Sequence, residues 1–391
     1  MNRNLLILIV VAAAVTIALA VTYVSMNKEG EDSDKYNLEG DWNLVSDYVG
    51  GWMDGVPIYG EDTTKKQKVS ISRYDGDFYT FDTGDKKLYC SWDGRKMITS
   101  GIEDDSSVAF ILLVPGSKVF MMVIHFVGDE GVIKLYQRDG YVGEFPGLSI
   151  PVDVPKVGET MESFKVREYT PDGAVDYYKS TVEIKNIEGR MLFYTVSNED
   201  GSRYETVCIY LSARIFMSMG VSETDVIYDM AEYRGGVLYC STINQKTGNS
   251  WVAEYGDESS ADYPDKNISG YKYTGSEDYV IFKDGKIVKQ RSDNNMGLNI
   301  LMQDDECLRI TTVDESGSEV ANWTCAMTDL RPIYHYGMSV QSLVEFDHKQ
   351  YYGWYFGYFD SKNCEELNIY GALTGSDGSC VVITQHYKLV R

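Results

Sequence analysis

The stretch SRYDGDFYTFDTGD, residues 72–85, gathers four aspartates around two glycines. A Ca²⁺ loop needs several converging oxygen ligands, as in the pattern D-x-[DN]-x-[DN]-G closed by a glutamate. Asp75 and Asp77 match the first two positions, but Tyr79 occupies the third and no glycine follows. Alternating apolar residues on both sides of Gly76 instead predict a β-hairpin with an acidic surface. No metal site is therefore assigned to this stretch.

Histidine and serine show no spacing that is typical of catalysis or of metal binding. The four histidines form neither an HxH nor an HExxH motif, so a zinc site would need ligands from distant segments. The chain also has no G-x-S-x-G motif and no phosphate-binding glycine loop. No catalytic residue, metal ligand or cofactor is assigned, and the protein is predicted not to be an enzyme.

The seven cysteines are too few for a disulfide framework in a chain of 391 residues. Cys90, Cys208 and Cys325 follow one another at spacings of 118 and 117 residues. We expect them to be small buried apolar side chains at equivalent places of a repeat. Outside the cell disulfides persist, and two pairings remain as alternatives, Cys307 with Cys325 and Cys364 with Cys380.

The segment QYYGWYFGYFD, residues 350–360, is the most suggestive candidate binding element. As a strand it would carry aromatic rings on both faces, although only one face can line the core of its own unit. Rings on the other face could stack on sugars or anchor a protein partner. The predicted ligand-binding residues are Tyr351, Trp354, Tyr355 and Phe359. The alternative is that both faces are buried in cores or between units.

A diverged internal repeat organises the chain. VSISRYDGDFYTF (69–81), VEIKNIEGRMLFY (182–194) and LNILMQDDECLRI (298–310) each lead alternating apolar residues to a turn and a second strand. Together with the spaced cysteines they indicate a threefold repeat, joined by proline-containing linkers. The predicted domains are an anchor and stalk at 1–36 and β repeats at 37–145, 146–258 and 259–391.

Each repeat has room for about eight short antiparallel strands, which is typical of a small barrel or sandwich. The predicted class is therefore all-β, with a propeller of two blades per repeat as the structural alternative. In the first repeat, Gly40-Asp41-Trp42 and Arg138 resemble the Gly-x-Trp start and the closing arginine of lipocalin-like (calycin) barrels. The resemblance implies that Arg138 covers the ring of Trp42 and that an interior cavity is present.

The N-terminus contains an uncharged apolar run of 22 residues, from Leu5 to Met26. At ~1.5 Å per residue this run spans the hydrocarbon core of a bilayer. Arg3 precedes it and an acidic segment follows, so the N-terminus is predicted to be cytoplasmic and the body extracytoplasmic. The alternative is a secreted protein cleaved near Ala20. Two sequons, at Asn267 and Asn322, are possible glycosylation sites.

The net charge of −23 argues against nucleic acid as a partner, because phosphates would be repelled. The predicted function is non-catalytic binding by a membrane-anchored, single-pass extracytoplasmic β-repeat protein. A glycan, a small apolar ligand or a protein remain the candidate partners. Two other functions stay open: an extracytoplasmic hydrolase with its site in a barrel mouth or between repeats, and a structural component of the cell envelope.

Overall fold

The structure, a computed structural model, describes residues 37–102, 108–148, 154–170, 173–176, 179–211, 215–221, 226–244, 250–261, 268–302, 307–327, 333–337, 351–359 and 364–391. Leu38–Arg391 forms one compact unit. The predicted anchor, its cleavage site and the acidic stalk, all within 1–36, lie outside the described residues. Among the residues that are described, no helix has the length and apolar character needed to cross a membrane.

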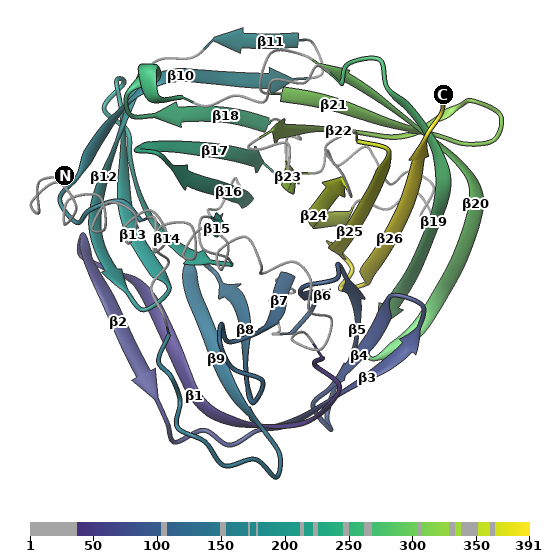
Figure 1. The fold of residues 1–391 in the computed structure, drawn as a ribbon. Coiled ribbons are helices and arrows are strands. Elements are labelled where there is room, and N and C mark those ends of the chain that lie inside the picture. The colour runs from purple at the N-terminus through teal and green to yellow at the C-terminus, as the bar shows by residue number, and fades with distance from the viewer. Residues whose placement is uncertain are drawn as a thin grey trace, which may run out of the picture. The chain divides into compact units, whose positions relative to one another are not determined.

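The first sheet is an antiparallel ring of eight strands, closed because β1 pairs with β9 (Figure 1). β2 pairs with the second half of β1, outside this ring. The strands are β1 (Gly40–Met53), β2 (Val56–Asp62), β3 (Lys68–Asp75), β4 (Phe78–Asp82), β5 (Lys87–Trp92), β6 (Met97–Ser100), β7 (Val108–Leu113), β8 (Phe120–Val127) and β9 (Glu130–Arg138). We call this ring the first barrel.

The second barrel repeats this topology, since β10 pairs with β18 and the extra strand β11 pairs with β10. A short 3₁₀ turn, η3 (Glu258–Ser260), follows its last strand. The strands are β10 (Thr160–Thr170), β11 (Gly173–Asp176), β12 (Ser180–Glu188), β13 (Met191–Asn198), β14 (Arg203–Tyr210), β15 (Ile215–Val221), β16 (Val226–Arg234), β17 (Val237–Asn244) and β18 (Ser250–Tyr255).

The third barrel closes through the pairing of β19 with β26. Its strands are β19 (Lys272–Lys283), β20 (Lys286–Met302), β21 (Cys307–Val313), β22 (Glu319–Met327), β23 (Ile333–Gly337), β24 (Tyr351–Phe359), β25 (Glu366–Gly375) and β26 (Cys380–Leu389). The three rings span 40–138, 160–255 and 272–389, each inside one predicted range. The prediction of tandem antiparallel barrels is confirmed, and the propeller alternative is wrong because every sheet closes on itself.

The repeat is visible in the position of the cysteines. Cys90, Cys208 and Cys325 all lie on the fourth strand of their ring, which is β5, β14 and β22 respectively. Cys90 and Cys208 are fully buried, as predicted. Residues 72–85 contain the predicted hairpin, in which β3 pairs with β4. Gly76 makes the turn at a φ of +51°, a left-handed conformation that glycine adopts easily.

Trp42 and Arg138 form the contact that the resemblance to lipocalin-like barrels implies. The two residues face each other across β1 and β9, and the Trp42 ring is fully buried. The Arg138 guanidinium carbon lies 4.6 Å from the ring centroid, within cation–π distance. The indole Nε1 donates to the Leu38 carbonyl oxygen at 2.9 Å. Together these contacts enclose the Trp42 ring where β1 and β9 close the first barrel.

One apolar cluster continues from the first barrel onto the outer faces of the other two. In β19, Tyr279 and Ile281 belong to the interior of the third barrel, whereas Val280 and Phe282 belong to the shared cluster. The second barrel contributes outward residues in the same way, among them Met191, Phe193, Val207, Ile209, Tyr228 and Met230. The strands in these regions are therefore buried on both faces, which is unusual for an antiparallel sheet.

Glycines allow the first and second barrels to approach closely. A Cβ placed on Gly131 of β9 would lie 3.0 Å from Ile209 Cδ1 and 3.0 Å from Val207 Cγ1, both on β14. Those contacts are tighter than ordinary van der Waals distances, and the two neighbours are branched and buried. Gly131 therefore permits this close approach, because a side chain there would force Ile209 and Val207 to shift.

Gly131→Val is expected to destabilise the protein by about 1–3 kcal/mol, the usual cost of overpacking a buried contact. Gly60→Val is the matched control, because a Cβ on Gly60 in β2 would meet nothing within 4 Å. Chemical denaturation of both variants measures the difference. Equal stability of the two variants would contradict the close packing of the first and second barrels.

Candidate functional site

The predicted aromatic residues lie on opposite faces of β24, and the two described rings are buried. Tyr351 is 2% exposed, belongs to the interior core of the third barrel and contacts the Ser379 hydroxyl. Trp354 is 3% exposed and lies with its ring centroid 6.5 Å from Phe110 and 5.3 Å from Tyr228. It thus contacts both other barrels, as the packing alternative supposes. The side chains of Tyr355 and Phe359 lie outside what the structure describes.

The second barrel contains a cavity of about 740 Å³. One half of its interior is filled by large side chains, among them Tyr210 and Phe216, whose ring centroids are 4.9 Å apart. In the other half several inward positions carry small side chains, which leave space inside an eight-stranded ring. These small residues are Ser180, Thr206, Ser218, Gly220, Cys240, Thr242 and Ala253.

Asp229 places a buried carboxylate on the wall of this cavity. It is 9% exposed and stands on β16. The Tyr194 hydroxyl donates to its Oδ2 at 3.1 Å, and the Thr242 hydroxyl donates to its Oδ1 at 2.9 Å. Both donors also line the cavity. Side chains from β13, β16 and β17 therefore hold one carboxylate in a fixed orientation.

Burial raises the pKa of Asp229 to about 6, because an ionised carboxylate is disfavoured away from water. Hydrogen bonds from Thr242, Tyr194 and Ser218 lower the pKa and partly offset this effect. Burial also raises the pKa of Cys208 and holds that of Cys240 well above its usual value. Both thiols therefore stay protonated, which is unfavourable for nucleophilic chemistry.

The wall of the second barrel is open beside the cavity. β14 pairs with β15 through Ile209↔Met217 and Tyr210↔Phe216, whereas β15 pairs with β16 over its whole length. Beyond these pairs, outward residues of both strands, Val207 and Met219, also border the cavity. Asp129, in the β8–β9 turn of the first barrel, borders it from outside. The cavity thus reaches the surface between two strands.

The first barrel has much less internal space. Its cavity measures about 90 Å³, because Phe81, Leu88 and Tyr136 project into it. The Tyr136 hydroxyl donates to Gln67 Oε1 at 2.7 Å. A cavity of this size holds a few water molecules rather than an organic ligand.

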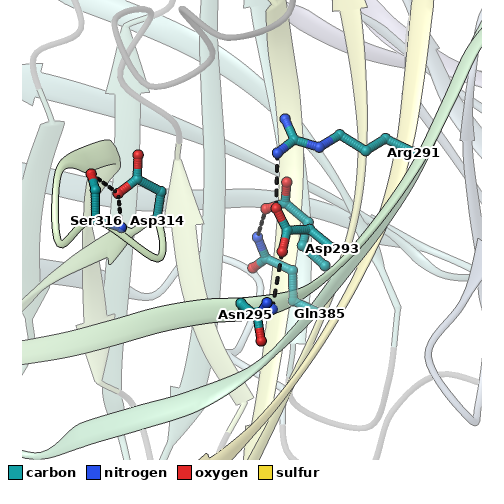
Figure 2. Close-up of polar contacts among 7 residues, drawn as sticks. Arg291, Asp293, Asn295, Asp314, Ser316 and Gln385 are labelled. Carbon is teal, nitrogen blue, oxygen red and sulfur yellow. Dashed lines mark hydrogen bonds and ion pairs between the residues drawn. The ribbon is translucent and has the colours of Figure 1, made fainter.

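Charged side chains pair with one another in the third barrel. Figure 2 shows Arg291 and Asn295 contacting the Asp293 carboxylate, with Gln385 beside them. Arg291 Nη2 lies 2.8 Å from Asp293 Oδ2, and the Asn295 backbone N–H donates to Oδ1. In the turn after β21, Asp314 accepts from the Ser316 backbone N–H. These contacts satisfy the charges locally.

The remaining sequence predictions can be placed briefly. Asp77, in the acidic hairpin, lies 3.1 Å from His386 Nε2 of the third barrel. Among the described residues, no group of three or more His, Cys, Asp or Glu side chains could hold a metal ion. The Cys364–Cys380 alternative is wrong, since neither cysteine forms a disulfide. Cys364 belongs to the interior core of the third barrel and Cys380 to the shared cluster. The Cys307, Cys325 and Asn322 side chains, and all of Asn267, lie outside the described part.

No family model and no curated protein sequence matches this chain. Among solved structures, transferrin binding protein B from Haemophilus parasuis is 10% identical, with 90% of this chain and 76% of that chain covered and a TM-score of 0.27. Transferrin binding protein B from Neisseria meningitidis is 9% identical, with 90% of this chain and 76% of that chain covered and a TM-score of 0.25. A DUF3598 protein of unknown function from Nostoc punctiforme is 9% identical, with 62% of this chain and 97% of that chain covered and a TM-score of 0.26. At these TM-scores the likenesses support no conclusion about fold or function.

The raised pKa of Asp229 predicts a pH-dependent stability difference between the wild type and Asp229→Asn. Because the folded carboxyl binds its proton more tightly than the unfolded one, its stabilising contribution is complete below about pH 4. It is lost as the pH rises through about 6, by about 3 kcal/mol in total. Denaturant unfolding of both proteins between pH 4 and pH 8 measures this change. A difference that stays constant over the range would mean that the Asp229 pKa is not raised.

Proposed function

We propose that the protein is a non-catalytic binding protein that holds a small, largely apolar ligand inside its second barrel. The observation that carries the proposal is the cavity of about 740 Å³, which lies within the range of small-molecule sites. Its wall combines apolar and aromatic residues, such as Val182, Val196 and Trp251, with one oriented carboxylate. A few fixed polar groups in an apolar pocket are typical of ligand recognition.

The chemistry of the cavity supports binding rather than catalysis. Asp229 accepts hydrogen bonds from neutral hydroxyls, and no histidine lies among the described residues that line the cavity. A hydrolytic site would need a nucleophile activated by a neighbouring base. The thiol at Cys240 is instead kept protonated by burial. A small molecule inside the barrel is also favoured over a glycan or a protein bound at the surface. Tyr351 and Trp354, two of the four aromatic residues predicted to bind such partners, are buried.

The proposal includes the location that the N-terminal sequence predicts. The apolar run Leu5–Met26 would anchor the chain with its body outside the cytoplasm, where the cavity could receive ligands from the environment or the membrane. A body released by cleavage near Ala20 would carry the same binding site.

Protease added to intact cells that express the chain with a C-terminal tag is expected to remove the tag. A cytoplasmic control protein should stay intact in the same cells. A tag that is protected in intact cells and digested only after lysis would contradict the extracytoplasmic location.

The neutral fluorescent probe N-phenyl-1-naphthylamine is expected to bind the full chain saturably, with the rise in emission that accompanies transfer to an apolar site. Gly220→Trp should weaken binding at least tenfold. Gly220 lines the cavity and pairs with Ile227 across β15 and β16, and an added Cβ would meet that side chain no closer than 4.0 Å. An indole there would occupy the cavity without straining the wall.

Gly60→Trp is the matched control, because it adds the same ring on the exposed strand β2 of the first barrel. It should leave the affinity unchanged, and circular dichroism should show that both variants are folded. If the wild type does not bind the probe, or if the two variants bind it equally well, the second barrel is not the binding site.

A further inference from the structure

The Asp229 carboxylate faces the cavity without a cationic partner. Its hydrogen-bond donors are neutral: the hydroxyls of Tyr194, Thr242 and Ser218, and the Met230 backbone N–H. Arg203 is the one lysine, arginine or histidine among the described residues that line the cavity. It precedes Thr206 by three residues on β14, roughly 10 Å along the strand, and lies on the face of the strand opposite to the inward-facing residues. No ion pair joins it to Asp229 in the described part of the chain.

Two other buried carboxylates in this protein have a cation beside them. Asp47 lies 2.7 Å from Lys65 Nζ, and Asp93 lies 2.7 Å from Lys96 Nζ. Removing a carboxylate from water costs several kcal/mol unless the charge is paired. At Asp229 the neutral donors relieve this cost only in part, which raises the pKa to about 6, so above that pH the carboxylate places a negative charge on an otherwise largely uncharged inner wall.

The hydrogen bonds around the carboxylate fix its orientation but bring no positive charge to it. The hydroxyl of Thr242 donates to Oδ1, and that of Tyr194 donates to Oδ2. The Ser218 hydroxyl and the Met230 backbone N–H add two further neutral donors. Since the hydroxyl donors come from strands on different sides of β16, they fix the carboxylate in place before any ligand enters. A preoriented acceptor of this kind gives charge-assisted hydrogen bonds their strength.

We propose that the ligand of the second barrel is a small apolar amine, whose ammonium group donates to Asp229 while its hydrocarbon body fills the cavity. This inference rests on the proposed binding function and adds the chemical class of the ligand. The cavity supplies apolar walls for the body, and Asp229 supplies the single anionic group for the head.

Two probes of the same shape separate the charge from the hydrocarbon body. 1-Adamantylamine is a cation at pH 7.5, and 1-adamantanol is its neutral counterpart. Each is titrated into the full chain by displacement of N-phenyl-1-naphthylamine. We expect the amine to bind at least tenfold more tightly than the alcohol. In Asp229→Asn this preference should disappear through weaker amine binding, with the affinity for the alcohol changed less than threefold.

Glu205→Gln is the matched control, because Glu205 is an exposed carboxylate at the rim of the same cavity, on the opposite face of β14 from Thr206. It should keep the preference for the amine. If the naphthylamine probe binds but the wild type does not distinguish amine from alcohol, the inference is wrong while the binding function stands. A preference that survives in Asp229→Asn, or is lost in Glu205→Gln, would also overturn it. Failure of the naphthylamine probe itself would instead contradict the proposed function.

Discussion

The outer faces of the three barrels are apolar where they meet, and the rest of the structure depends on covering them. An antiparallel ring in water normally places polar residues outside, but Val280 and Phe282 alternate with interior residues of β19 and are equally buried. Each barrel alone would expose a large apolar surface, which soluble proteins avoid. Trp354 is the clearest example. Its ring belongs to the shared cluster outside the third barrel and contacts an aromatic ring of each of the other two barrels.

Packing on the outside leaves the interiors free to differ. In the first barrel large inward side chains and the Trp42–Arg138 contact leave little space. In the second barrel small inward residues leave a cavity, and Asp229 brings a carboxylate to its wall. The corresponding position in the first barrel is Ala109, since Ala109 pairs with Thr99 as Asp229 pairs with Ser218. Divergence between repeats therefore points to the interior of the second barrel as the functional difference.

Local patterns predicted much of the fold from the sequence. The alternation around Gly76 predicted the hairpin of β3 and β4, and the spacing of Cys90 and Cys208 predicted the repeat. The resemblance at Trp42 and Arg138 predicted the contact between these two residues. These features depend on short-range periodicity or on a conspicuous residue type. The two-faced aromatic strand was recognised as well, although its sequence could not show what covers Trp354, because that depends on contacts with distant strands.

The candidate site could not be predicted in this way. Asp229 lies in the segment VIYDMAEY, and nothing in this segment distinguishes it from the other residues among the 59 aspartates and glutamates of the chain. Its inward direction follows from the register of β16 with β15 and β17. The cavity itself results from small side chains on several strands, such as Ser180 on β12, Ser218 on β15 and Thr242 on β17, which are far apart in the sequence. The clearest available signal was a charged residue at a position that alternates with buried apolar ones.

The most direct test of this account is a crystal structure of the protein with a brominated adamantylamine, in which anomalous scattering locates the bromine independently of the interpretation of the map. The account predicts one bromine peak inside the second barrel, with the amine within hydrogen-bonding distance of the Asp229 carboxylate. A peak in the first or third barrel or on the outer surface, with the second barrel empty, would contradict it.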